Sequence, residues 1–271
     1  MKMPLFVLWY LVGCTTHPTQ NDTTTPDVFR KDTLLFEEQE VLIHSIRHPE
    51  HTGETHKESD LKKPVLSAST CSLTVPEPYK QDRRAKKGTL IVVYKSLFRL
   101  GLYQNGSIQK IDGKNACFPI AMGHKPWGPK FKRDFESTPE GWYNIADKRD
   151  IGHSMFYRSL QVSYPNREDI KRALDHQVIS QTVYHRLLKQ INSGSSATQG
   201  TAMGGWIMIH GLGSESPFWT AGCIATANEV MDLLFPFVHV NDPILIIPWE
   251  LNVKANGILI PLDPTPEDPF A

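Results

Sequence analysis

Short runs of β-branched and aromatic residues dominate the hydrophobic pattern of the second half of the chain, and runs of this kind predict β-strands. They lie at 89–94, 99–103, 108–111, 117–122, 142–145, 160–164, 207–209 and 244–247. The pair Asn105-Gly106 directly follows the second run and is a strong signal for a tight turn. We therefore expect a mainly β domain with short helices, spanning about residues 88–250.

Helical periodicity is limited to a few short segments. The apolar residues of 32–47 and 180–191 recur on one face, and a weaker pattern covers 169–174. A further helical run, which contains Val230, Leu233 and Leu234, follows Cys223. Helices are thus predicted as additions to a β framework.

The N-terminus has the pattern of an export signal. One basic residue, Lys2, precedes about ten apolar residues, too few to span the ~30 Å hydrocarbon core of a bilayer stably. The end of this run, Leu11-Val12-Gly13-Cys14, resembles the lipobox of bacterial lipoproteins, in which Cys14 becomes lipidated after cleavage. An ordinary signal peptide followed by a chance cysteine is the alternative. We expect a lipoprotein anchored to a bacterial membrane by Cys14 and facing the periplasm.

The segment after the signal is polar. Residues 15–31 are rich in Thr, Asp, Asn and Pro and predict a flexible tether. Four histidines, which suggest a metal site, follow at His44, His48, His51 and His56. Pro49 breaks the helix that would align them, and no cysteine or carboxylate framework surrounds them, so we favour a solvated linker and predict no metal.

Composition excludes several classes of function. The 271 residues include 29 basic and 29 acidic side chains, so the net charge is zero. We therefore do not expect the protein to bind nucleic acid through its overall charge. The mean hydropathy is negative and the apolar run is terminal, which excludes a multi-span membrane protein. The chain has no dinucleotide-binding or P-loop glycine pattern, and we predict no cofactor.

The four cysteines are Cys14, Cys71, Cys117 and Cys223. If Cys14 carries lipid, three remain in an oxidising compartment, and an odd number leaves one unpaired. The sequence alone does not determine connectivity. We favour a Cys71–Cys117 disulfide, which leaves Cys223 as a reactive thiol.

Two neighbouring segments carry the candidate chemistry, Gly204 to Gly211 and Trp219 to Ala225. His210 ends a buried strand, and Cys223 follows a small-residue turn and precedes a helical run. The positive end of a helix dipole stabilises the thiolate form of a cysteine at a helix N-terminus, and a nearby histidine can take the thiol proton. The amides of Gly222 and Cys223 are candidate oxyanion donors. The alternative is a buried structural cysteine and a hydrogen-bonded strand-end histidine.

The surrounding motifs favour the chemical interpretation. The sequence contains, in order, Gly128-Pro129-Lys130, Thr138-Pro139-Glu140-Gly141-Trp142-Tyr143, Ser159-Leu160-Gln161-Val162-Ser163-Tyr164-Pro165-Asn166 with Asp169, His210-Gly211, and Thr220-Ala221-Gly222-Cys223. In these motifs the chain resembles the L,D-transpeptidase catalytic domain family of the YkuD type over roughly residues 90–249, and within it the branch of YafK-like periplasmic enzymes. The resemblance implies a β-sandwich-like catalytic domain with the cysteine at the mouth of a cleft.

The resemblance also implies a reaction and its residues. Cys223 would be the nucleophile, His210 its base, and the carbonyl of Gly211 the group that orients the histidine. Thr220, Gly222 and the Cys223 amide would line the oxyanion region. Cys223 would attack an L,D amide of a peptidoglycan stem peptide to give a thioester, which an amine acceptor resolves by transpeptidation and water by hydrolysis.

The chain departs from the family at the substrate-binding positions. Ala225 stands where the family often has an arginine suited to a substrate carboxylate. Lys130, Lys125 and Arg133 are candidate replacements, and Tyr157 stands where the branch commonly has a histidine.

Four tryptophans suggest sugar stacking, although packing is the more common role of such residues. They are Trp127, Trp142, Trp206 and Trp219, of which we keep Trp219 as a cleft residue because it precedes Cys223 by four positions.

The predicted layout is a signal peptide at 1–13, a tether and N-terminal extension at 14–87, a catalytic domain at 88–250 and a tail at 251–271. The expected partners are peptidoglycan stem peptides and, through the lipid anchor, a membrane. The alternatives are a hydrolase on the same scaffold, which would be an L,D-carboxypeptidase or an amidase that releases wall-linked protein, and a non-catalytic wall-binding lipoprotein. The sequence does not predict the oligomeric state.

Overall fold

The computed structural model describes residues 71–213, 216–253 and 259–261 of the chain. All of them belong to one compact unit, Ala68–Ala271. The predictions for the signal peptide, Cys14, the tether, the 32–47 helix and the histidine cluster lie outside the described residues. Within the described part, no helix has the length and apolar character needed to cross a membrane.

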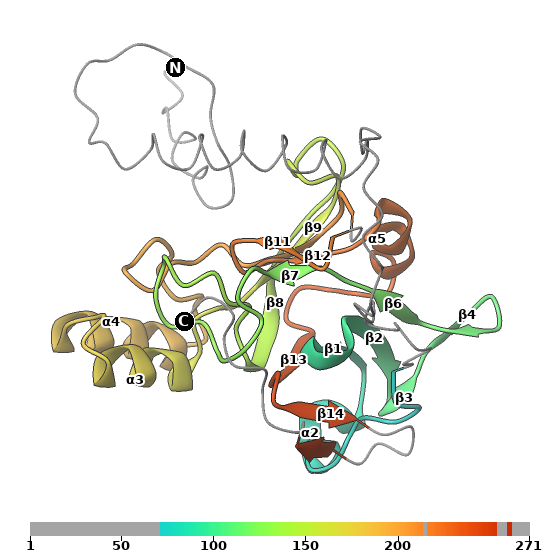
Figure 1. Cartoon of the computed structure of the whole chain (residues 1–271), viewed down its shortest axis with the longest axis horizontal. Helices are drawn as coiled ribbons and strands as arrows, with labels where there is room; N and C mark the ends of the chain where they lie inside the picture. The colour runs from blue at the N-terminus through green and yellow to red at the C-terminus, as the bar shows by residue number, and fades with distance from the viewer. Residues whose placement is uncertain (1–70, 214–215, 254–258, 262–271) are drawn as a thin grey trace, which may run out of the picture. The chain divides into compact units, whose positions relative to one another are not determined.

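Nine of the described strands form one curled sheet (Figure 1), in the order β12-β10-β9-β8-β13-β1-β2-β3, with β6 also pairing with β2. Their bounds are β1 Thr89–Tyr94, β2 Arg99–Gln104, β3 Ser107–Ile108, β6 Cys117–Pro119, β8 Gly141–Arg149, β9 Ser159–Val162, β10 Met208–His210, β12 Ile224–Ala225 and β13 Pro243–Ile247. The pairs β1–β13 and β10–β12 are parallel, and the others in this sheet are antiparallel. The predicted mainly β class is confirmed.

Short strand pairs complete the β structure. They are β7 Met122–Gly123 with β11 Phe218–Thr220, β4 Lys110–Ile111 with β5 Lys114–Asn115, and β14 Leu251–Val253 with β15 Leu259–Pro261. The predicted tight turn lies between β2 and β3, where Asn105 and Gly106 have φ of +52° and +81°. Asparagine and glycine tolerate this left-handed backbone best, which is why the pair marks the turn.

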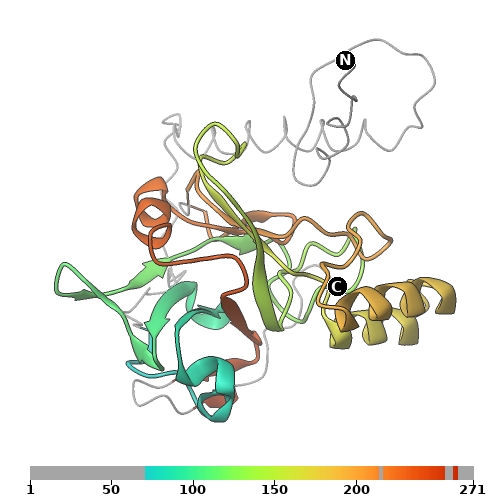
Figure 2. The same cartoon turned by 180° about the vertical axis from the view of Figure 1, so that it is seen from behind.

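The helices are short. They are the 3₁₀ turns η1 Tyr79–Gln81 and η2 Lys95–Leu97, and the α-helices α2 Arg83–Lys86, α3 Arg167–Asp175, α4 Gln181–Asn192 and α5 Asn228–Leu234. The helices predicted around 169–174 and 180–191 are confirmed as α3 and α4. These two helices lie side by side, beyond one end of β8 (Figures 1 and 2).

The central strands are buried on both faces because each contributes to two hydrophobic clusters. In β1, Ile91 and Val93 belong to the cluster that also contains residues of α3, α4 and α5, whereas Leu90 and Val92 belong to a second cluster on the other face. The two-residue period of a strand sends alternate side chains to opposite faces. This explains why the sequence shows continuous apolar runs rather than alternation.

Residues 71–87, assigned above to the N-terminal extension, pack on this fold. Val75 and Ala85 are buried in the second cluster, and Cys71 forms a disulfide with Cys117 of β6. The structure therefore has the disulfide that the sequence favoured, and Cys223 keeps its thiol.

Candidate active site

His210 and Cys223 come from neighbouring parallel strands. His210 is the last residue of β10 and is level with Ala225 of β12, while Cys223 directly precedes β12. Both residues are buried, and each is 1% exposed. Residues 211–222, which include β11, separate them in the sequence, and the pairing of β10 with β12 brings the two segments together.

The histidine ring is held on three sides. Its Nδ1 lies 2.6 Å from the carbonyl oxygen of Gly211. A carbonyl only accepts, so Nδ1 carries the proton and Nε2 is left as the basic nitrogen. Phe156 stacks on the ring at 4.3 Å and Trp219 meets it edge-on at 5.8 Å. The Gly211 carbonyl therefore lies where the orienting role predicted from the family resemblance requires it.

The turn that presents Cys223 is fixed by Thr220. Its Oγ1 donates to the Cys223 carbonyl at 2.7 Å and accepts the Gly222 N–H at 3.2 Å, while the Cys223 Sγ lies 3.7 Å from the carbonyl of Trp206. Gly222 has φ of +121°, and a Cβ there would lie 2.7 Å from the Ser137 carbonyl. In this conformation the Gly222 amide serves the turn, so it is not poised as the oxyanion donor that the sequence suggested.

The predicted helix N-terminus at Cys223 is wrong. Ile224 and Ala225 form β12, and α5 begins only at Asn228. Two residues are too few to show a strand period, and tertiary pairing with β10 decides their conformation. Because the influence of a helix dipole falls off within the first turn, α5 does not account for a thiolate at Cys223.

The three basic residues predicted as partners for a substrate carboxylate lie in different environments. Lys130 is 2% exposed and its Nζ faces backbone carbonyls, so it does not fit a surface partner for a substrate carboxylate. Arg133 is exposed and donates to the carbonyls of Gly200 and Thr201. Lys125 lies over the Phe135 ring.

Tyr157 is also engaged within the protein. Its hydroxyl lies 3.0 Å from a carboxylate oxygen of Asp232 in α5. Its role toward substrate stays a prediction.

Two of the four tryptophans border the cysteine–histidine pair. Trp219 is 37% exposed and contacts His210, which suits a cleft residue. Trp206, expected only to pack, supplies the carbonyl near the Cys223 Sγ. Trp206 has φ of +57°, and the Gly204-Gly205 pair that precedes it is a sequence signal that could have indicated an unusual backbone there. Trp142 instead packs under the Arg84 guanidinium, 4.0 Å from the ring centroid.

The other motifs organise the scaffold. Tyr143 donates to Asp169 at 2.7 Å, and Asp169 forms a capping box with Asn166 at the start of α3. Burial raises the pKa of Asp169 to about 6. Glu140 pairs with the buried Lys95, and burial lowers the pKa of that lysine.

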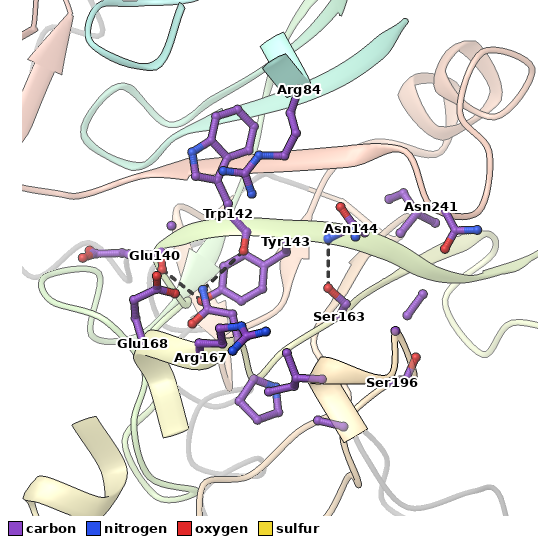
Figure 3. Close-up of a pocket in the computed structure, with 18 of the residues that line it drawn as sticks. Arg84, Glu140, Trp142, Tyr143, Asn144, Ser163, Arg167, Glu168, Ser196 and Asn241 are labelled. Carbon is purple, nitrogen blue, oxygen red and sulfur yellow. Dashed lines mark hydrogen bonds between the residues drawn. The ribbon is translucent and has the colours of Figure 1, made fainter. Parts of the chain in front are cut away.

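A cavity of about 610 Å³ lies away from this pair, around β8 and the start of α3 (Figure 3). Arg84 and Trp142 lie on one side of β8, and Arg167 and Glu168 on the other. Neither His210 nor Cys223 lines this cavity. The described residues also hold no cluster of three or more His, Cys, Asp or Glu side chains suited to a metal ion.

Fold and site together define a mainly β protein with a buried cysteine beside a carbonyl-oriented histidine. Residues 88–246 match the family model of the L,D-transpeptidase catalytic domain, YkuD, and the chain belongs to this family. Members of the family are cysteine-dependent enzymes that act on peptidoglycan stem peptides. No curated protein matches the chain.

The solved structures that the chain matches include L,D-transpeptidases. The L,D-transpeptidase of Xylanimonas cellulosilytica is 13% identical, with 60% of this chain and 62% of that chain covered and a TM-score of 0.36. The helical cell shape determining protein Pgp2 of Campylobacter jejuni is 19% identical over 67% of this chain and 52% of that one, with a TM-score of 0.39. An L,D-transpeptidase of Mycobacterium tuberculosis is 14% identical over 59% and 57%, with a TM-score of 0.34. The chain therefore spans less than two thirds of each of these proteins.

Proposed function

We propose that this protein is a peptidoglycan L,D-transpeptidase in which Cys223 forms a thioester with a stem peptide and transfers it to an amine. The observation that carries the proposal is the 2.6 Å contact between His210 Nδ1 and the Gly211 carbonyl. It fixes the tautomer and leaves Nε2 as the base, on the strand next to the cysteine.

The reaction follows the order of thiol acyl transfer. His210 Nε2 takes the Cys223 proton, and the sulfur attacks the carbonyl carbon of an L,D amide to form a C–S bond and an oxyanion. The oxyanion collapses, the C–N bond breaks, and the imidazolium protonates the departing amine. The acceptor amine then attacks the thioester, His210 takes its proton, and the C–S bond breaks to regenerate the cysteine.

Hydrolysis is the second candidate, and a specific observation favours it. Ala225 offers no group for a substrate carboxylate, and the Lys130 Nζ faces backbone carbonyls. A site that binds an acceptor stem weakly would admit water to the thioester. The hydrolase would then trim stem peptides or release wall-linked protein.

The test is mass spectrometry of muropeptides after incubation of the detergent-solubilised full-length protein with sacculi rich in tetrapeptide stems. New crosslinks between third stem residues, or exchanged fourth residues, are expected with the wild type. They should be absent with Cys223→Ala and His210→Ala and present with the control His185→Ala, an exposed histidine of α4. Tripeptides alone would establish a hydrolase that trims stem peptides. Unchanged muropeptides would overturn both the transpeptidase and this stem-trimming hydrolase, and release of wall-linked protein would then be tested with sacculi that carry such protein.

We also propose that Cys14 carries a lipid that holds the enzyme on a bacterial membrane, facing the periplasm. The lipobox-like Leu11-Val12-Gly13-Cys14 supports this. Radiolabelled palmitate should be incorporated into the wild type and not into Cys14→Ala, which should move to the soluble periplasmic fraction. Equal membrane retention of both proteins would refute the anchor.

A further inference from the structure

Lys130 is a buried lysine attached to the turn that presents the nucleophile. It is 2% exposed. Its Nζ lies 2.9 Å from the Phe135 carbonyl and 3.4 Å from the carbonyls of both Arg133 and Ala221. Ala221 is two residues before Cys223, so one ammonium group bridges the loop after β7 and the Cys223 turn.

The loop and the turn are in close contact. A Cβ on Gly222 would lie 2.7 Å from the Ser137 carbonyl, and a Cβ on Gly123 would meet both the Glu136 carbonyl and the Gly222 Cα. A side chain at either glycine would push loop and turn apart. The position of the Cys223 turn therefore depends on how residues 128–138 are held.

A second buried lysine holds the same loop at its two ends. The Lys95 Nζ donates to the carbonyls of Gly128 and Thr138 and pairs with Glu140. Lys95 thus fixes where the loop begins and ends, whereas Lys130 joins its interior to Ala221. Lys95 therefore binds the two ends of the loop, and Lys130 binds the turn that contains Cys223.

An ammonium at this place has two physical effects on Cys223. By binding the Ala221 carbonyl it fixes the peptide plane that leads into Gly222. As a positive charge in a buried setting, it also favours the charged form of an acidic group nearby. α5 begins too far along the chain to act on the thiol, so Lys130 adds its charge to that of the imidazolium that forms when His210 takes the thiol proton.

We propose that Lys130 is a positioning residue for Cys223, setting the geometry of the nucleophile turn and favouring the thiolate. The proposal rests on Cys223 being the nucleophile. It replaces the helix N-terminus as the source of positive potential at the thiol.

Other ionisable side chains lie on the segments packed against this turn. They are His210 in β10, His124 after β7, and Lys125, Lys132, Arg133, Asp134 and Glu136 in the loop. Of these, His210 is buried and the others are exposed or half-buried. His210 is the proposed base for the thiol proton, so the experiment is repeated in a His210→Ala background.

The test is the pH dependence of alkylation of Cys223 by iodoacetamide, measured on the full-length protein by site-resolved mass spectrometry. Lys130→Met should move the rate profile to higher pH by about one unit, which is a roughly tenfold slower alkylation near neutral pH. Lys130→Arg, which keeps the charge, should lie nearer the wild type than Lys130→Gln. The control Lys132→Met, an exposed residue of the same loop, should match the wild type.

Folding is checked by circular dichroism and by retention of the Cys71–Cys117 disulfide. A folded Lys130→Met with the wild-type profile overturns the proposal, and so do coincident Arg and Gln profiles if Met does not fold. The alkylation readout needs no peptidoglycan. A positive result here with unchanged muropeptides would therefore refute the transpeptidase while leaving the role of Lys130 intact.

Discussion

At the scale of single residues, the Thr220 hydroxyl holds the backbone of the turn that carries Cys223. It donates to the Cys223 carbonyl and accepts from the Gly222 amide. Thr220→Val keeps the shape and removes both hydrogen bonds, each worth about 1 kcal/mol, so we expect kcat to fall roughly tenfold or more. Thr220→Ser keeps the hydroxyl and should stay near wild type. Equal turnover of muropeptides by the Val and Ser variants would contradict this role.

The buried Asp169 makes stability depend on pH. Its pKa is raised from 3.8 to about 6 in the folded protein, chiefly by burial. The folded state therefore binds more protons than the unfolded state between about pH 4 and 6, and its stability falls as pH rises through this window. Above about pH 6 this contribution of Asp169 to the free energy of unfolding is fully lost.

Asp169→Asn removes this titration and serves as the reference. We expect the wild type to lose up to about 3 kcal/mol of unfolding free energy relative to the variant between about pH 4 and 6. Urea denaturation at a series of pH values measures the difference. Parallel curves for the two proteins would show that Asp169 does not titrate in this range.

At the scale of elements, α3 begins at a capping box that the sequence carries in Asn166 and Asp169. Asn166→Ala removes the side-chain cap and should cost about 1–2 kcal/mol of unfolding free energy. Asn166→Ser retains a cap acceptor and should lose less than half as much. Chemical denaturation gives both values, and muropeptide conversion by both variants should stay near wild type because α3 carries neither His210 nor Cys223. Equal losses of unfolding free energy in Asn166→Ala and Asn166→Ser would mean that the side-chain cap contributes little to stability.

The region after Cys223 shows how an element can be misjudged. Helical spacing of Val230 and Leu234 predicted a helix, and α5 contains both residues. Its start is where the prediction failed, because β10 pairs with Ile224 and Ala225 and extends the sheet first. A partner strand distant in sequence provides those hydrogen bonds, and local periodicity does not report it.

At the scale of the whole molecule, the Cys71–Cys117 disulfide joins the first described segment to the sheet. The two residues are 46 positions apart, and closing a loop of this length stabilises the fold by about 4 kcal/mol in the chain-entropy model. Cys71→Ser with Cys117→Ser should lower the unfolding free energy by about 2–5 kcal/mol. Denaturant unfolding measures it, and Cys223 alkylation should be unchanged. Unfolding at the wild-type denaturant midpoint would contradict the prediction.

The sequence by itself determined the strand-rich class, the turn at Asn105-Gly106 and the helices α3 and α4, and its ordered motifs indicated His210 and Cys223 as the candidate pair. These features depend on local patterns: side-chain period, left-handed turn residues and ordered motifs. The family resemblance also pointed to the Gly211 carbonyl that orients His210. It gave no reason to place Lys130 inside the protein, since a lysine is usually solvated.

Only the tertiary structure decided the strand order, the position of Trp206, the engagement of the Gly222 amide and the burial of Lys130. Each depends on contacts between segments far apart in the chain, such as the loop at 128–138 and the turn at 220–223. Local sequence reports the conformations that a segment prefers. Which group forms the hydrogen bond to a buried carbonyl or amide is decided only when segments distant in the sequence come together. At the Cys223 turn this group is the Lys130 ammonium, whereas the sequence predicted a helix N-terminus there.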